Sequence, residues 1–509
     1  MQIKMAKALK SRASKQAYVS QHQLVLSGFE SPFSRTLNPN NRWVKLAHKI
    51  PWDSLVGVYI TQMGNSETGA EGINPRVAIG SLIIKHICDL SDRETVMQIQ
   101  ENMYMQYFIG YGSFSDEPPF DPSLFVEFRK RLGSDQINEI NEKILGLSKN
   151  PASDSPASEH PVTSTTPLTE CTITEGITHR GKLLVDATAC PQDISYPTDL
   201  NLLNDAREKS EELIDILFAK SRQEKKPRTY REVARKYYLK TAQKKHKTKK
   251  EIRGAIRKQL GYLKRNLTSL NKLLDEHKFI PLGKHEYKYL LVINTLYDQQ
   301  SSMFRNHSHS IEHRIVSIHQ PHVRPIVRGK TNANVEFGAK IQVSLIDGFS
   351  FLDTLSWEAF NEGKYLQDTI DQFKTRFGYY PKEVLADKIY CNRENRTQLK
   401  LLGIKLIAKP LGRPKAVNKE HIRPCERNPI EGKFGQAKTA YGLNRIKARL
   451  QSTSESWIAT IILVLNLVKL AGKVPFYLSL SVIGFIIKCF ENIPMNLEAA
   501  KRSKLGALT

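Results

Sequence analysis

The spacing of apolar and polar positions predicts a helical first part of the chain. Residues 40–133 carry apolar side chains at helical spacing, interrupted by short polar turns. The run after Pro75, RVAIGSLIIKHICDL, is apolar on every side, which predicts a core helix. Residues 91–94 (SDRE) have the pattern of a capping box that opens a short helix, and residues 121–123 (DPS) precede another.

The last of these helices ends in three consecutive basic residues, Arg129, Lys130 and Arg131. Short helices joined by tight turns, with a basic last turn, fit a helix-turn-helix-like DNA-binding module. A plain helical bundle fits the same pattern equally well. We therefore expect a helical DNA-binding domain at 40–150, preceded by a basic arm at 1–39.

A change of composition marks a boundary after this domain. Residues 151–170 contain twelve Ser, Thr or Pro among twenty positions, which is typical of a linker. We expect a linker at 151–178.

Strand patterns begin after the linker. GKLLVDAT (181–188) predicts a strand ending in Asp186, and residues 339–348 and 350–357 predict two strands joined by a tight glycine turn. The elements expected next alternate between helix and strand: a helix at 369–378, a strand at 382–390 ending near Asp387, a helix at 395–403, a strand at 404–410, and a helix from Pro429 with Asn428 as its N-cap. Strands first and then alternating helix and strand indicate an α/β (α+β) fold, a mixed sheet covered by helices.

Two late apolar runs, 457–470 and 476–490, are shorter than a membrane span and contain Asn466, Lys469 and Lys488. They predict buried helices, with a helical segment at 471–509. No apolar core follows the start MQIKMAKALKSRASK, so we expect no signal peptide and no membrane association.

The charge of the chain indicates a polyanionic partner. The 509 residues carry a formal net charge of +25, while 40% hydrophobic and 25% charged residues are typical of a soluble globular protein. Residues 220–265 hold nineteen Lys or Arg against three Glu, so 19 − 3 = +16 of that charge lies in one segment. Leucines and isoleucines recur there at helical spacing, which predicts a basic helical insertion at 200–330. A solvated face is the alternative for each single lysine, but a density of +16 repels itself unless an anion neutralises it.

The six cysteines include no C-x-x-C pair, which argues against a zinc module and a disulfide framework and favours a reducing cytoplasm.

Three acids stand at informative positions: Asp186 and Asp387 at predicted strand ends, and Glu431 in a predicted first helical turn. Carboxylates grouped in this way can hold a pair of Mg²⁺ ions that activate a water or a 3′-hydroxyl for in-line attack on a phosphate. The alternative for Glu431 is a capping residue on a solvated helix. Four other acids near strand ends compete for the same role: Asp193, Asp199, Asp347 and Asp353.

Longer blocks of the chain resemble the DDE transposases of bacterial insertion sequences. The block GSLIIKHICDLSDRETVMQIQENMYMQYFIGY resembles the helical InsH-like N-terminal domain of that family, GKLLVDATACPQDISYPTDL its first-Asp block, GYYPKEVLADKIYCNRENR its second-Asp block, and ERNPIEGKFGQAKTAYGL its Glu block. The resemblance covers most of residues 40–470. It implies a ribonuclease-H-like catalytic domain at 179–200 and 330–470, interrupted by the insertion.

The resemblance also implies roles for individual residues. Asp186, Asp387 and Glu431 would form the metal-binding triad, with Mg²⁺ or Mn²⁺ as cofactor. The Glu block of the family has the pattern Y-x2-R-x3-E-x6-K. Arg427, Glu431 and Lys438 fit this spacing, whereas Pro424 stands at the Tyr position. In the family this Arg and Lys bind phosphates of the transposon ends, and strand transfer at two ends implies at least a dimer.

Basic residues elsewhere are expected to contact the DNA backbone. In the insertion these are Lys244, Lys245, Lys249, Lys250, Arg253, Arg257 and Lys258; just before the strand at 339–348 they are His322, Arg324, Arg328 and Lys330; in the helical domain they are Arg129, Lys130 and Arg131. His309 and His313, spaced i and i+4 beside His307, have the spacing of a transition-metal site, but no H-E-x-x-H signature surrounds them.

The sequence therefore predicts a transposase of the bacterial cytoplasm and nucleoid that binds double-stranded DNA, its own terminal inverted repeats and a target, and cuts and joins it. Three alternatives stay open: a decayed or domesticated transposase that only binds DNA, a ribonuclease-H-like nuclease without strand transfer, and an RNA-binding protein.

Overall fold

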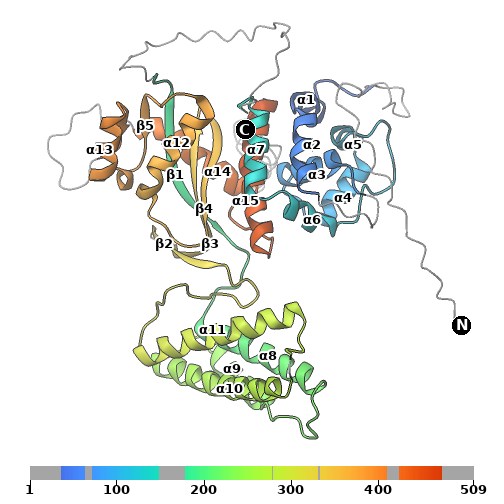
Figure 1. Cartoon of the computed structure of the whole chain (residues 1–509), viewed down its shortest axis with the longest axis vertical. Helices are drawn as coiled ribbons and strands as arrows, with labels where there is room; N and C mark the ends of the chain where they lie inside the picture. The colour runs from blue at the N-terminus through green and yellow to red at the C-terminus, as the bar shows by residue number, and fades with distance from the viewer. Residues whose placement is uncertain are drawn as a thin grey trace, which may run out of the picture. The chain divides into compact units, whose positions relative to one another are not determined.

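The structure is a computed structural model (Figure 1). It describes residues 36–63, 72–147, 178–277, 279–330, 333–409 and 424–472. The basic arm up to residue 35, nearly all of the predicted linker, and the predicted helix at 476–490 lie outside these ranges.

Contacts divide the chain into two units. The first comprises, among the described residues, 36–147, 432–442 and 460–472; the second comprises 178–431 and 443–459. Helices α14 (Pro424–Ala440) and α15 (Gln451–Ala471) each contribute to both units. The two units are described separately.

The first unit is helical, as the pattern predicts. Its helices are α1 (Arg42–Lys49), α2 (Trp52–Thr61), α3 (Pro75–Ile87), α4 (Asp92–Glu101), α5 (Met103–Ile109), α6 (Leu124–Arg131) and α7 (Ser134–Ile144), joined by the ends of α14 and α15. Every residue of α3 is buried, which confirms the predicted core helix. The Ser91 hydroxyl accepts a hydrogen bond from the Glu94 N–H at 3.1 Å, so the predicted N-cap of α4 is confirmed.

An aromatic cluster around one buried cation forms the core of this unit. The rings of Trp43 and Trp52 each lie 5.2 Å from that of Phe108. Arg76, only 1% exposed, lies 4.5 Å over the Trp52 ring and donates from Nε and Nη2 to the Phe108 carbonyl at 3.1 and 3.0 Å. A guanidinium is tolerated there because it meets the carbonyl end of α5.

Arg129 belongs to this core as well. Its side chain is buried, pairs with Asp92 and lies over the Phe125 ring, while Lys85 pairs with the same carboxylate at 3.0 Å. The prediction that Arg129 contacts DNA is therefore wrong, because burial and the ion pair occupy its guanidinium. Its neighbour Lys130 is exposed and pairs with a surface Glu.

Helix α15 is long and apolar enough to cross a membrane by length and composition, but 72% of its apolar window is buried within the protein. Its polar residue Asn466 is fully buried and donates to the Asn141 carbonyl oxygen at 2.8 Å. The helix therefore has a core role, as predicted for residues 457–470.

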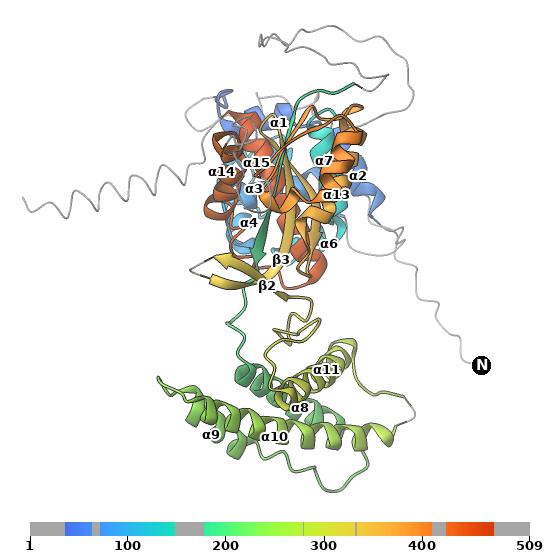
Figure 2. The same ribbon diagram turned by 90° about the vertical axis from the view of Figure 1, so that its left-hand side faces the viewer.

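The second unit is built on a mixed sheet (Figures 1 and 2). Its described strands are β1 (Lys182–Pro191), β2 (Arg324–Lys330), β3 (Ala333–Ile346), β4 (Phe349–Ser356), β5 (Glu383–Leu385) and β6 (Lys405–Ile407). The order is β2-β3-β1-β5-β6, and β4 also pairs with β3. Strand β3 is antiparallel to β1, β2 and β4, whereas β1, β5 and β6 run parallel. The predicted mixed sheet is confirmed.

The predicted glycine turn joins β3 to β4. Asp347 and Gly348 both have positive φ, 49° and 78°, as a two-residue hairpin turn of the primed type requires. Helix α12 (Leu366–Phe377) packs against these strands, since the Gln342 amide donates to the Thr369 hydroxyl at 2.7 Å. Helix α13 (Arg393–Leu401) confirms the helix expected before Gly403.

Three of the boundaries that differ from the prediction bear on the site. Strand β1 does not end at Asp186, because its pairing with β3 continues to Pro191 opposite Gly338. Strand β2 occupies residues 324–330, where a basic loop was expected, because this segment pairs with β3 at the sheet edge. Helix α14 begins at Pro424, so Pro429 lies inside the helix and Glu431 beyond its first turn.

The predicted insertion is helical. It contains α8 (Asp199–Phe218), α9 (Arg231–Ala242), α10 (Lys249–Asp275) and α11 (Lys284–Asn306). Leu203, Ile214, Leu263, Leu270 and Ile293 are fully buried in one apolar cluster contributed by three of these helices. The helical spacing of apolar residues therefore reports a true core beneath the basic surface.

Gly338 provides a test of the sheet. A Cβ at this position would lie 2.1 Å from the Cys190 carbonyl oxygen, which is backbone and has little freedom to move. We expect Gly338→Ala to lower the free energy of unfolding by about 1–3 kcal/mol, measured by urea denaturation. Gly261→Ala, in α10 with nothing within 4 Å of the added methyl, is the control and should gain about 1 kcal/mol. Equal effects of the two substitutions would contradict the proposed close approach of β1 and β3.

Candidate active site

Parallel strands bring two of the predicted acids together. Strands β1 and β5 pair with Leu184 opposite Leu385, and Asp186 and Asp387 each lie two residues further along. The two aspartates therefore occupy equivalent positions beside each other, although the helical insertion and several strands separate them in sequence. The sequence placed both residues at strand ends; Asp387 does follow β5, whereas Asp186 lies within β1.

The Asp186 carboxylate is held in a partly desolvated position. Its side chain is 18% exposed, and one oxygen accepts the Ala187 N–H at 2.8 Å. Burial raises the pKa of Asp186 to about 6; the negative charges of Glu362 and Asp387 act in the same direction, whereas Arg427 opposes them. Because burial disfavours the ionised form of Asp186, a nearby cation would stabilise its carboxylate.

The Asp387 carboxylate is more exposed, at 48%, and caps a short 3₁₀ helix, Lys388–Tyr390. Its Oδ1 accepts the Lys388 N–H at 2.7 Å. The cap fixes the carboxylate at the end of β5.

Arg427 joins the two aspartates. Its Nη1 donates to Asp387 at 3.4 Å and its Nη2 to Asp186 at 3.5 Å. Both contacts are long for charge-assisted hydrogen bonds, so the guanidinium acts mainly as a nearby positive charge. Arg427 lies in the first turn of α14. The predicted helix start at Pro429, with Asn428 as N-cap, had placed Arg427 in the loop before the helix.

Glu431 lies one helical turn beyond Arg427 on α14 and is exposed. Among the described residues, no three His, Cys, Asp or Glu side chains are gathered closely enough to hold a metal ion. The structure thus brings together Asp186 and Asp387 and leaves Glu431 on the adjoining helix. Lys438 follows in the last turn of the same helix, on the face that carries Glu431.

Sequence reasoning missed two residues of the site. Glu362, on a 3₁₀ helix (Glu362–Tyr365), is 16% exposed and pairs with Lys340 at 2.8 Å. Tyr390 is fully buried, and burial, Glu362 and Asp186 raise its pKa well above the usual value, so the phenol stays protonated. Neither residue was marked as a site residue, because Glu362 lies outside the predicted elements and Tyr390 was only the last residue of the strand predicted at 382–390.

The four competing acids have other contacts. Asp353 is buried and pairs with Arg376 at 2.8 Å; Asp193 pairs with Arg445 at 3.0 Å. Asp199 opens α8, and Asp347 belongs to the β3–β4 turn. These contacts leave Asp186 and Asp387 as the pair at the sheet.

The paired carboxylates of Asp186 and Asp387 are oxygen ligands of the kind that a hard divalent cation prefers. The described residues gather no third acid with them closely enough to complete a metal site. A single guanidinium between the two aspartates indicates that this position favours positive charge.

The histidines give no support to a zinc site. His313 Nδ1 lies 3.0 Å from Glu358 Oε1, and no cluster of metal-binding side chains occurs among the described residues.

His322 and Arg324, both expected to contact DNA, make contacts within the protein. Burial, with Lys288 and Arg324, lowers the pKa of His322 to about 4, and its ring packs against Trp357. Arg324 donates to Glu358 at 2.8 Å. His322 is therefore neutral at physiological pH, and Arg324 is occupied within the protein. Arg328 and Lys330 continue along β2.

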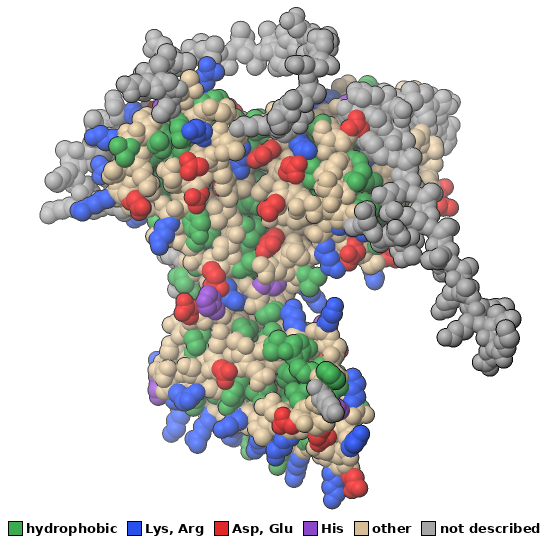
Figure 3. Space-filling view, viewed as in Figure 1, with side chains coloured by type: hydrophobic (Ala, Val, Ile, Leu, Met, Phe, Trp, Pro, Cys, Tyr) green, Lys and Arg blue, Asp and Glu red, His purple; other side chains and the backbone are tan. Residues whose placement is uncertain are grey.

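Basic side chains crowd one edge of the insertion (Figure 3). Residues 244–250 are all exposed, and only Lys244 among their lysines has an ion pair in the described part of the chain, with Glu251 at 2.5 Å. Lys258 lies 3.5 Å over the Tyr237 ring, and Arg257 is exposed beside it. Interleaved cations and aromatic rings are the composition that nucleic-acid backbones and bases favour.

Asp186 should reduce the stability of the fold at neutral pH. Because its folded-state pKa of about 6 exceeds the ordinary 3.8, the folded protein retains a proton that the unfolded chain loses between these values. The contribution of Asp186 to the free energy of unfolding therefore falls as pH rises from 3.8 to about 6. We expect Asp186→Asn to be more stable than wild type by about 1–3 kcal/mol near pH 7.5 and similar near pH 4, measured by urea denaturation.

Glu251→Gln is the control of opposite sign. Hydrogen bonds from Lys244 and Thr248 lower the pKa of Glu251 to about 2, so this variant should be less stable at neutral pH. The difference should shrink as pH falls from the ordinary 4.5 through about 2. A gain from Asp186→Asn that is the same at both pH values would contradict the desolvated carboxylate.

Comparisons with known proteins find transposase domains in two parts of the chain. The family described as "Transposase DDE domain" matches residues 384–468, which include Asp387 and Glu431, and "Transposase domain (DUF772)" matches residues 31–131. An uncharacterized protein, ORF8 in the nfe locus of Rhizobium meliloti, is 28% identical over 177 residues, covering 34% of this chain and 73% of that protein. No solved structure matches. A DUF772 transposase domain model and a transposase DDE domain model thus match separate parts of the chain, and together they support an insertion-sequence transposase.

Proposed function

We propose that this transposase binds the terminal inverted repeats of its own element and catalyses divalent-metal-dependent DNA cleavage and strand transfer. The observation that carries the proposal is the parallel register of β1 and β5. It sets Asp186 and Asp387 side by side, with Arg427 of α14 donating to both. Two neighbouring carboxylates at a sheet are the arrangement that a two-metal phosphoryl-transfer site requires.

The mixed sheet also supports a ribonuclease-H-like catalytic domain. Three antiparallel strands, β2 to β4, lead into the parallel strands β5 and β6 through α12, and β1 lies between the two sets. The long insertion enters between β1 and β2, so the proposed catalytic domain is discontinuous in sequence.

Asp186, Asp387 and Glu431 would hold the metal ions, with Mg²⁺ or Mn²⁺ supplying an activated water or 3′-hydroxyl and charge stabilisation for the leaving oxygen. Arg427 neutralises the two aspartates and can turn toward a phosphate, because its side chain is 23% exposed and its contacts are long. Lys438, two turns after Glu431, would bind a further phosphate. Glu431 must approach the aspartate pair when DNA binds.

The insertion would hold the DNA backbone. Its exposed lysines and the rings of Tyr230 and Tyr237, each beneath a cation, form a surface suited to phosphates. Lys130 and Arg131 of the helical domain are proposed as further contacts. Because strand transfer joins two ends, we propose a dimer as the active form.

Removing the acids tests the chemistry. We expect Asp186→Ala, Asp387→Ala and Glu431→Ala each to slow Mg²⁺-dependent cleavage of end-containing DNA by roughly a thousandfold, about 4 kcal/mol, because each would remove a metal ligand. Asp371→Asn, an exposed acid of α12, is the control and should cleave normally. Cleavage is measured on a labelled duplex carrying the flanking inverted repeat.

The same assay separates the alternatives. Full activity of Glu431→Ala would remove this residue from the triad and favour Glu362 as the third acid. Cleavage without joined product, when a pre-cut 3′ end and target DNA are supplied, would identify a nuclease. DNA binding without any cleavage by the wild type would identify a non-enzymatic derivative.

Neutralising the basic edge tests the insertion. We expect Lys245→Gln with Lys250→Gln to weaken binding of duplex DNA and to flatten its dependence on salt, by up to about 0.9 in the log–log slope for each phosphate that the variant no longer neutralises. Lys272→Gln with Lys284→Gln removes equal charge from the exposed surface outside residues 220–265 and should leave the slope unchanged. Equal slopes in both variants would show that the basic edge is only a solvated face. Stronger competition by RNA than by duplex DNA would favour an RNA-binding protein.

A further inference from the structure

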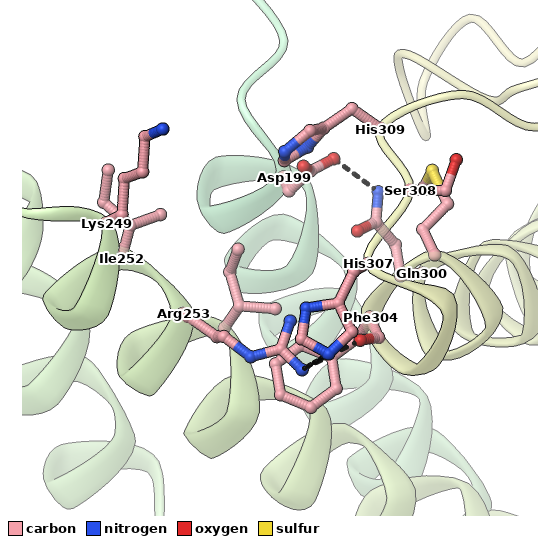
Figure 4. A pocket seen from close by; sticks show the side chains of 11 residues that line it. Asp199, Lys249, Ile252, Arg253, Gln300, Phe304, His307, Ser308 and His309 are labelled. Atoms are coloured by element: carbon pink, nitrogen blue, oxygen red, sulfur yellow. Dashed lines mark hydrogen bonds between the residues drawn. The ribbon is translucent and has the colours of Figure 1, made fainter.

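A pocket lies inside the helical insertion, apart from the acids of the proposed active site (Figure 4). The first turns of α8 and α10 and the end of α11 surround it. Its volume is about 290 Å³. Nothing in the proposed cleavage chemistry uses this pocket.

The pocket combines an apolar wall with cations. Ile252, Ile256, Met303 and Phe304 supply the apolar surface. Lys249, Arg253, His307 and His309 supply basic groups around it. Such a combination suits a ligand that has one flat apolar part and one anionic part.

Arg253 is held in a fixed position at the pocket. Its guanidinium lies 4.1 Å over the Phe304 ring, and Nη2 donates to the Phe304 carbonyl at 3.1 Å. The same nitrogen lies 3.2 Å from His307 Nε2. His307 ends α11 in the left-handed conformation, with φ of 50°. Because these contacts order the guanidinium in advance, little side-chain entropy is lost when it binds an anion.

The acid of the pocket is neutralised within the protein. Asp199 accepts hydrogen bonds from Gln300 Nε2 at 2.9 Å and from Arg314 Nη2 at 2.8 Å. Figure 4 shows Asp199 facing Gln300, with Arg253 and His307 beside Phe304. The charge that the pocket presents to a ligand is therefore positive.

We infer that this pocket binds a single nucleotide unit, with the base against the apolar wall and the phosphate on Arg253 and Lys249. The volume lies near the lower limit of about 300 Å³ for small-ligand sites, which suits one base and its sugar and excludes a duplex. Bases bind proteins by stacking on apolar, aromatic and guanidinium surfaces. The unit is either a free nucleotide or an unpaired nucleotide of bound DNA, and only the second source rests on the proposed function.

Arg253→Gln tests the pocket, with Lys272→Gln as its matched control. Both remove one positive charge from α10, but Lys272 is exposed and does not line the pocket. Calorimetry with adenosine 5′-monophosphate measures the free nucleotide. Fluorescence anisotropy compares blunt duplex DNA with the same duplex carrying a one-nucleotide 5′ overhang. Ile252→Glu is a second variant, which places a negative charge at the exposed mouth and leaves Arg253 packed.

We expect Arg253→Gln and Ile252→Glu to weaken nucleotide binding about tenfold or more, and Lys272→Gln to leave it unchanged. Binding of the monophosphate identifies a site for free nucleotides. A preference for the overhang without monophosphate binding, abolished in the two pocket variants alone, identifies a site for an unpaired nucleotide of DNA. Absence of both, or equal weakening in Arg253→Gln and Lys272→Gln, overturns the inference.

The Asp387→Ala variant separates this inference from the proposed chemistry. It should bind the nucleotide as the wild type does, because the pocket contains no residue of the sheet. Loss of cleavage with retained nucleotide binding leaves the pocket inference intact.

Discussion

The carboxylates of Asp186 and Asp387 lie far apart in the sequence but both contact the guanidinium of Arg427. These contacts connect β1, β5 and α14. The parallel register of β1 and β5 makes Asp186 and Asp387 neighbours. Neighbouring carboxylates repel each other and the sheet partly desolvates one of them, so a cation beside them is strongly favoured. Arg427 meets this need from the first turn of α14, and Glu431 lies one helical turn further along the same helix.

Elements governed by local signals could be predicted from the sequence. The buried helix α3 follows from its unbroken apolar run, and the β3–β4 turn follows from Asp347 and Gly348. Elements whose extent depends on residues distant in the sequence could not be predicted from it. The length of β1 is set by its pairing with β3, and the edge strand β2 is hidden by proline and charged residues. Pro429 resembled a helix start, but the helix begins at Pro424.

The candidate site was predictable only in part, for a related reason. Acids beside strands, such as Asp186 and Asp387, have a sequence signal because strand ends and acids can both be recognised. Glu362 and Tyr390 approach Asp186 only through folding, so no local pattern marks them. The sequence does not distinguish buried from exposed basic residues. In the fold, Arg129 is buried against Asp92, whereas the lysines at 244–250 are exposed to solvent.

The position of the insertion explains how a large basic bundle can interrupt the sheet without separating its acids. Pro191, the last residue of β1, and Arg324, the first of β2, both pair with Gly338 from opposite sides of β3. Two strand spacings amount to about 10 Å, so the chain leaves the sheet and returns close to the same place. An insertion whose two ends lie close together places little strain on the sheet that it interrupts. The buried leucine cluster stabilises the bundle internally, so its charged edge can be selected for binding without weakening the sheet that holds Asp186 and Asp387.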